Sequence, residues 1–279
     1  MRSFRSEWVK LARVRQVLAV WGLMIALMLL LTSLIFLNAG TEADRAAAAA
    51  KAASGQRGGG PVILISELQK ADGLTSVMRF AGNILGIVTL VLFAGNLAGE
   101  YSNGTLKALL SRQPHRLRLL SGKLAALFSF SILGIVLAAL AEMGTAGLIA
   151  SSRHFDTSAW WTGSNLYVTA AIVGRLIVGN AVWAALGAVL AILFRSGPAA
   201  IGIGIGYVIV GEGLLSLAIP DVVRYLPGQV IAAFESHGVA SNNLPNPITY
   251  GAAAGFMALY LVVFLGTAGI VFWRRDVAN

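Results

Sequence analysis

Six long apolar stretches divide the chain, and each contains enough consecutive residues to cross a bilayer. A span takes about 20 residues, because an α-helix rises ~1.5 Å per residue. A water-soluble helix needs a polar face, and these stretches have none along most of their length. We therefore expect an all-α, polytopic membrane protein with six transmembrane helices, the fifth broken by Glu212. The expected spans are Val17–Leu37, Phe80–Ala98, Leu124–Ala141, Leu176–Phe194, Pro198–Ile219 and Gly251–Trp273.

The segment ahead of the first span is amphipathic. Phe4, Trp8 and Leu11 follow i, i+4, i+7 spacing, and basic residues occupy the opposite side. Aromatic and basic side chains in this arrangement are typical of helices that lie in a membrane interface. We expect residues 1–16 to form an interfacial helix that contacts lipid through Phe4, Trp8 and Leu11.

Basic residues are distributed unevenly between the spans. The formal net charge is +9, and Lys and Arg concentrate before the first span and in the loop after the second. Loops rich in Lys and Arg stay on the cytoplasmic side of a membrane. The pattern predicts a multi-pass protein of the cell membrane with both termini in the cytoplasm. The basic excess is thus a topology signal and a contact for anionic lipid, not a nucleic-acid site.

This topology makes the chain one transmembrane domain, 1–279. A cytoplasmic coupling loop is expected at 99–122, and the longer extracytoplasmic loops at 38–79 and 220–247. In the last of these, the apolar stretch Val222–Phe234 is too short to span and predicts a surface or re-entrant helix. The outer loops act either as structural caps or in substrate gating.

The connection between the third and fourth spans contains two adjacent tryptophans, Trp160 and Trp161. Tryptophan is enriched where a membrane meets water, because the indole ring is apolar but carries one polar N–H group. These two residues are therefore expected in an interfacial aromatic belt.

Composition and motifs exclude several kinds of chemistry. The chain has no Cys, and its three His residues all lie outside the expected spans. It contains no P-loop for nucleotide and no motif of the serine hydrolases or zinc proteases. We expect no catalytic residue, no metal site and no cofactor, so the chain is not expected to be an enzyme.

Three charged residues, Glu142, Arg175 and Glu212, fall within or next to the apolar stretches. Counted along their helices, all three lie in the outer leaflet or at its edge, and charges there are costly and often functional. One interpretation is an outer gate closed by a pair of Arg175 with Glu142 or Glu212. The other is a static salt bridge or simple solvation at the interface.

The loop after the second span has the most specific pattern. Glu100 ends an apolar helix, Gly104 allows a sharp bend, and Thr105 is suited to cap a short helix that stops before Pro114. A basic stretch then returns to the membrane. The pattern predicts a short cytoplasmic helix on a hinge, with leucines and basic groups available to a partner.

This loop resembles the permeases of type-2 ABC exporters. Their signature after the second span is an acid, an aromatic residue and Gly-Thr-Leu, followed by leucines, a Pro, an Arg and a Lys. The outline of the whole chain is also similar, including Glu7-Trp8-x-Lys10, the Arg195-Ser196 turn and Tyr225-Leu226-Pro227; His115 departs from the commoner Ser or Thr. The residues that match the loop signature are Glu100, Tyr101, Gly104, Thr105, Leu106, Leu109, Leu110, Pro114, Arg116 and Lys123.

The resemblance implies that Tyr101–Arg112 is a coupling helix that docks on a separate ATP-binding subunit, with Glu100 as a polar pivot. It also implies two copies of that subunit and a second permease copy, either identical or related. Such permeases export hydrophobic or amphipathic compounds, peptides, lipids or glycans. The implied coupling residues are Glu100, Tyr101, Gly104, Thr105, Leu106, Leu109, Leu110, Arg112 and Pro114.

Two alternatives remain open. A secondary exporter works without an ATPase, but it needs ionisable groups near the middle of the membrane and usually an internal repeat, and the sequence has neither. A membrane anchor or immunity protein that sequesters its ligand requires neither feature. The transported substrate is not indicated by any motif.

Overall fold

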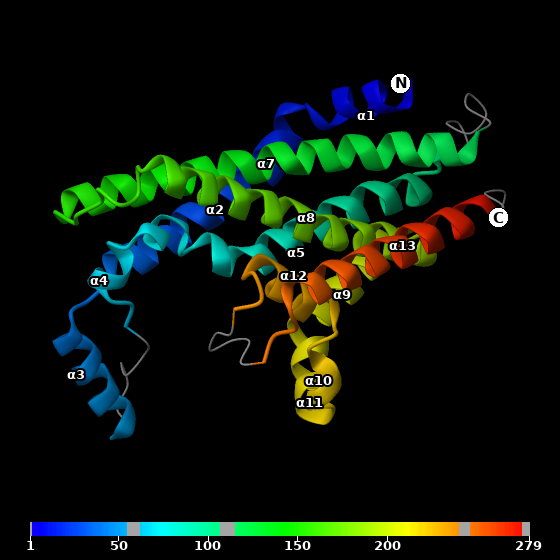
Figure 1. Cartoon of the computed structure of the whole chain (residues 1–279). Helices are drawn as coiled ribbons and strands as arrows, with labels where there is room; N and C mark the ends of the chain where they lie inside the picture. Colours follow the sequence, from blue (N-terminus) through cyan, green and yellow to red (C-terminus); the bar gives the residue numbers. More distant parts are fainter. Residues whose placement is uncertain (1, 55–61, 107–114, 240–245, 275–279) are drawn as a thin grey trace. The chain divides into compact units, whose positions relative to one another are not determined.

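The computed structural model describes residues 2–54, 62–106, 115–239 and 246–274, and these are almost entirely helical (Figure 1). Six helices are long and apolar enough to cross a membrane, as predicted. The fifth span is a composite of three segments. The spans are α2 (Val14–Leu37), α5 (Met78–Ser102), α7 (Arg116–Ser152), α8 (Gly163–Phe194), α9–η2–α10 (Gly197–Gly206, Tyr207–Gly211 and Glu212–Ala218) and α13 (Tyr250–Arg274). The shorter helices are α1 (Arg2–Leu11), α3 (Glu42–Ala53), α4 (Ile65–Leu68), η1 (Ala71–Thr75), α11 (Pro220–Val223) and α12 (Pro227–Glu235).

Two of the spans are much longer than the expected stretches. α7 has 37 residues and α8 has 32, although about 20 suffice to cross a bilayer. The expected limits were set where the first charged or strongly polar residues appear. A helix continues past such residues as long as its backbone hydrogen bonds continue, so polarity marks the edge of the hydrocarbon and not the end of the helix.

The fifth span is irregular, as expected, but the irregularity begins before Glu212. Residues Tyr207–Gly211 form a π-helical turn between α9 and α10. The span on both sides of this turn is rich in glycine, which weakens regular α-helical structure. π-Turns inside α-helices are rare and are frequent at functional sites.

The chain divides into two compact units. The first comprises Met1–Val20, Gly82–Gly134 and Arg175–Asn279, and the second comprises Trp21–Ala81 and Ile135–Gly174.

The second unit is held together by side chains that bind backbone carbonyls. Arg153 donates to the carbonyls of Phe36, Leu37 and Ala39 at the end of α2, where a helix leaves such groups without partners. Trp160 is fully buried, donates to the carbonyls of Leu68 and Lys70, and packs edge-on against Phe36. Trp160 is therefore a structural residue, and its assignment to an interfacial belt was wrong.

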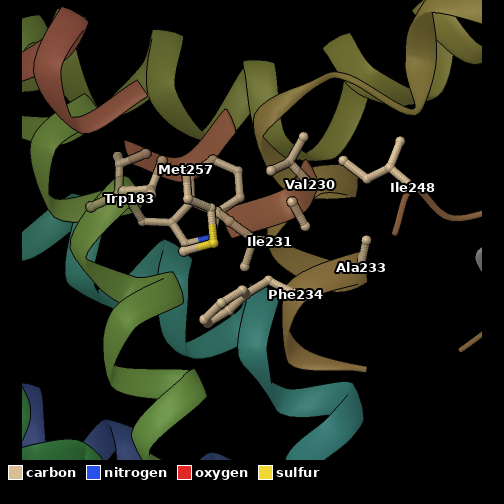
Figure 2. Close-up of a cluster of buried hydrophobic side chains, with 10 residues drawn as sticks. Trp183, Val230, Ile231, Ala233, Phe234, Ile248 and Met257 are labelled. Atoms are coloured by element: carbon tan, nitrogen blue, oxygen red, sulfur yellow. The ribbon is translucent and has the colours of Figure 1, made fainter. Parts of the chain in front are cut away.

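In the first unit, the short helix α12 lies in the core. Most of its residues are buried, and Val230, Ile231 and Phe234 pack in one cluster with Trp183 of α8 and Met257 of α13 (Figure 2). Phe234 also stacks on Tyr250 at the start of α13, with ring centroids 5.0 Å apart. The expected short helix in the last loop thus exists as α12, and it is buried in the first unit; a re-entrant path through the membrane stays a prediction.

Candidate functional site

The loop after α5 begins with a sharp turn. α5 ends at Ser102, the N–H of Asn103 donates to the Gly99 carbonyl, and Gly104 has a φ of 66°. Only glycine adopts this left-handed conformation without strain, which explains the glycine at this position. Helical backbone resumes at Thr105, and the next side chain, Leu106, is 2% exposed.

Four charged side chains surround the base of this loop, and we call them the ionic cluster: Glu7, Lys10, Glu100 and Lys123. Lys123, near the start of α7, donates to Glu7 of α1 at 2.7 Å and also to Glu100 near the end of α5. Lys10 donates to Glu100 at 3.2 Å and lies 3.5 Å from the other oxygen of Glu7. The cluster therefore joins α1 to the helices on both sides of the loop.

The ionic cluster is buried and electrically balanced. The side chains of Lys123, Glu100 and Glu7 are 3%, 8% and 10% exposed, whereas that of Lys10 is 37% exposed. Removing charged groups from water is costly, and the cost is recovered only when partners and hydrogen bonds are in place. Two acids and two bases in mutual contact meet that condition, so the three helices are held in one arrangement.

Two further contacts hold the ends of the loop. The guanidinium of Arg195 lies over the ring of Tyr101, 5.8 Å from its centroid, and Arg195 itself has a left-handed φ of 53° in the turn after α8. At the other end of the loop, Arg116 donates to the carbonyl of Trp273 in α13. Tyr101 is thereby connected to the Arg195-Ser196 turn, a pairing that the sequence pattern did not indicate.

The aromatic side of α1 packs on the protein. Leu11 is fully buried, Trp8 meets the ring of Phe130 edge-on at 6.2 Å, and Phe4 stacks on Trp8 at 6.0 Å. Phe4 is the most exposed of the three expected interface residues, at 37%. The amphipathic helix is confirmed as a helix, but Leu11 faces protein, not lipid. Lipid contact by Phe4 and Trp8 stays a prediction.

The three expected gate residues are held in separate surroundings. In the second unit, Glu142 is fully buried, and the backbone N–H groups of Val77 and Met78 lie close to its carboxylate but outside hydrogen-bonding geometry. In the first unit, Glu212 accepts a hydrogen bond of 2.7 Å from the N–H of Gly228, in the first turn of α12. Glu212 therefore binds the backbone of α12, and the charge of Arg175 acts on a different acid, Glu235.

The sequence also matches a known protein family. The sequence pattern of a family described as "Protein of unknown function (DUF2705)" matches residues 61–278. The chain belongs to the DUF2705 family. An uncharacterized protein of Bacillus subtilis (strain 168), YhcI, is similar to it, with 23% identity over 217 residues. That similarity covers 70% of this chain and 66% of YhcI, just under two thirds of the relative's length.

The DUF2705 match includes two of the four residues of the ionic cluster. Glu100 and Lys123 lie within the matched residues, whereas Glu7 and Lys10 of α1 precede them. The matched part also contains Arg195, Glu212 and Glu235.

The middle of the loop is not described by the structure. Four expected coupling residues, Leu109, Leu110, Arg112 and Pro114, lie outside the described residues, so the short helix that they predict stays a prediction. Thr105 was expected to cap that helix; its hydroxyl donates, at 3.5 Å, to the carbonyl of Glu100 in the preceding helix.

Sequence reasoning missed the clustering of Glu7, Lys10 and Lys123 as one site, and it missed Glu235. The sequence did contain a signal for the cluster, because its charged residues lie next to the ends of the first three apolar stretches. The signal for Glu235 was its place at the end of the apolar stretch Val222–Phe234.

Within the described ranges, no group of three or more His, Cys, Asp or Glu side chains is arranged to hold a metal ion.

Proposed function

We propose that this chain is the membrane-spanning permease subunit of an ATP-driven exporter of the ABC type, with ATP hydrolysis on a separate partner chain. In this proposal two ATP-binding subunits dock on the cytoplasmic loop after α5, and a second permease copy completes the path. The protein lies in the cell membrane with both termini in the cytoplasm.

The observation that carries the proposal is the ionic cluster at the base of the loop. A partner that pushes on residues 103–115 acts on the end of α5 and on the start of α7, and Lys123 binds groups on both α5 and α1. Because the cluster is buried and its charges are balanced, these helix ends resist separation and move together. A loop with such a base transmits force from a cytoplasmic subunit into the spans.

The positive charge of this side and the signature residues agree with that role. Tyr101 is held by Arg195, which extends the same base to α8. Leu106 is already buried against this chain, so the apolar groups left for a partner are the expected Leu109 and Leu110.

Co-purification tests the proposal directly. The tagged full-length chain is isolated, in a mild detergent, from the cell that makes it, and any ABC ATP-binding subunit that elutes with it is identified and its ATPase activity measured. We expect a stable complex, and we expect Leu109→Asp to abolish it because a charge would replace an apolar docking contact.

The matched control is Val239→Asp, which places the same charge at a residue that is 63% exposed and outside the loop. This variant should bind the ATPase as the unchanged chain does. If no ATP-binding subunit elutes, or if Leu109→Asp and Val239→Asp behave alike, the exporter proposal is wrong. The anchor or secondary-exporter interpretation then becomes the better one.

A further inference from the structure

The last residue of helix α12, Glu235, is a buried acid in the first unit. Glu235 is 8% exposed, and its carboxylate lies between glycines of two spans, Gly82 of α5 and Gly179 of α8. We call these two glycines the glycine notch. The notch lets the backbones of α5 and α8 come close to α12 at its buried end.

The carboxylate occupies the space next to both glycines of the notch. A Cβ atom at Gly82 would lie 2.0 Å from Oε2 of Glu235, and one at Gly179 would lie 2.5 Å from Oε1. At Gly179 the Ile231 side chain is also only 2.9 Å from that position. A methyl group therefore does not fit at either glycine while the carboxylate is in place.

The carboxylate is also short of partners. Its Oε1 atom is buried, and among the described residues no group donates a hydrogen bond to it. The charged group that acts on it is Arg175, one helical turn before Gly179 on α8, yet within the described chain no ion pair joins the two side chains. Nε of Arg175 is itself buried without a hydrogen-bond partner there. An ionised carboxylate left in this state is strongly disfavoured.

Among the described residues, the charge that acts on Glu235 is that of Arg175. Close to the carboxylate, α5 presents Gly82 and α12 presents Ile231, while the titratable ring of His237 packs against Tyr250, with ring centroids 4.2 Å apart. Burial raises the pKa of the Glu235 carboxyl well above its ordinary value of 4.5, and the positive charge of Arg175 opposes that rise only in part. Binding a proton neutralises this carboxylate and needs no additional space.

We propose that Glu235 binds a proton when α12 is seated in the glycine notch and releases it to water when α12 withdraws. The seated form is then a neutral carboxylic acid, and the withdrawn form is a solvated carboxylate plus a hydronium ion. Seating of α12 is thereby linked to proton uptake. This linkage is independent of whether an ATPase drives the protein.

The sign of the linkage follows from mass action. At a pH between the two pKa values of Glu235, the seated form holds one proton more than the withdrawn form. Raising the pH therefore favours withdrawal, by up to about tenfold in the equilibrium constant per pH unit. Lowering the pH favours the seated form.

Thiol accessibility measures the seating of α12. The chain has no Cys, so a single introduced cysteine reports alone. Ala233→Cys places it at a fully buried residue of α12, and Val239→Cys places a reference at a residue that is 63% exposed. The ratio of their maleimide labelling rates in the full-length protein in lipid nanodiscs cancels the pH dependence of the thiol itself.

We expect this ratio to rise with pH, by as much as tenfold per unit, in chains that keep Glu235. In the Ala233→Cys chain with Glu235→Gln, which has the shape of the protonated acid, the ratio should stay low at every pH. The matched control is Glu42→Gln, an exposed acid on α3, which should leave the rise unchanged. Infrared spectra of the chain with Glu235 should lose a protonated carboxyl band over the same pH interval.

Three outcomes overturn the proposal. A labelling ratio that does not change with pH would show that seating is not linked to a proton. Fast labelling of the Glu235→Gln chain at every pH would show that α12 is held by the charge of Glu235, as in a pair with Arg175. Should Glu235→Gln fail to fold, infrared spectra of the unchanged chain in which no protonated carboxyl band changes with pH decide against the proposal without it.

Discussion

Glu100 and Glu235 are both buried acids in the same compact unit, and they are held in opposite ways. Glu100 accepts hydrogen bonds from two lysines, and a second acid, Glu7, balances the charge. Glu235 sits in a glycine notch with a buried oxygen that no described group bonds, and only the distant charge of Arg175 acts on it. The first arrangement stabilises ionised groups, and the second favours a neutral acid.

The difference bears on what each site can do. A balanced ionic cluster fixes helices relative to one another, because every separation leaves a charge without its partner. An acid whose charge is not compensated makes its helix sensitive to proton concentration. The ionic cluster at the end of α5 therefore fixes helices in place, whereas Glu235 at the end of α12 makes the position of that helix respond to pH.

The largest expected effect is the loss of Lys123. Lys123→Ala leaves Glu7 and Glu100 buried with Lys10 as their remaining partner, and breaking a buried charge pair in this way costs about 3–5 kcal/mol. Thermal unfolding of the purified protein in detergent measures the loss. Lys10→Ala is the matched control, since that side chain is 37% exposed and its removal should cost about 1 kcal/mol or less. Equal losses for the two lysines would contradict the distinction between a buried and a peripheral member of the cluster.

A smaller effect is expected from filling the glycine notch. Gly179→Ala brings a methyl group into the Glu235 carboxylate and the Ile231 side chain, and overpacking of this kind costs about 1–3 kcal/mol. Gly174→Ala is the control on the same helix, because nothing lies within 4 Å of its added Cβ. Thermal unfolding should separate the two variants. A Gly179→Ala chain as stable as the Gly174→Ala chain would mean that α12 does not sit in the notch.

The smallest effect concerns an exposed acid that serves as a reference for both sites. Hydrogen bonds from the Thr41 backbone and side chain lower the pKa of Asp44, the third residue of α3, which forms a capping box with the N-cap residue Thr41. Its contribution to stability is present above the ordinary carboxyl pKa and is lost as the pH falls through the lowered one, the reverse of the expectation for Glu235. Asp44→Asn should therefore lower the helicity or stability of the α3 segment slightly at neutral pH and have no effect in strong acid. Circular dichroism as a function of pH gives the comparison, and a loss that persists in strong acid would contradict it.

The six spans could be predicted because the thickness of a bilayer requires long apolar stretches, and a single polar residue does not obscure such a stretch. The two ends of α7 and the start of α8 could not, because Lys123, Glu142 and Arg175 mark the membrane edge while each helix continues past them. The break in the fifth span was visible in its glycines and Glu212. The π-turn itself is defined by the carbonyl to which each backbone N–H donates, and the sequence does not determine that pairing in any visible way.

The site was predictable only in part. The pattern around Glu100 and Gly104 located the loop after α5, but Lys123 and Glu7 are 116 residues apart, and no local pattern pairs them. Trp160 was misassigned because an indole that binds two carbonyls in a protein core has the same sequence context as one in a membrane interface. Glu235 was overlooked because its surroundings come from glycines, which leave no chemical signature in the sequence.

The π-turn at Tyr207–Gly211 also sets the direction in which Glu212 points. A π-turn accommodates one residue more than an α-helix, and each residue of an α-helix advances the side chains by roughly 100°. Deleting one residue of this turn would leave a regular helix of the same apolar character. It would also rotate the Glu212 carboxylate away from the N–H of Gly228, and with it the contact that holds the first turn of α12. The extra residue thus acts as a phase shift in the fifth span that aligns an acid on one helix with the backbone of another.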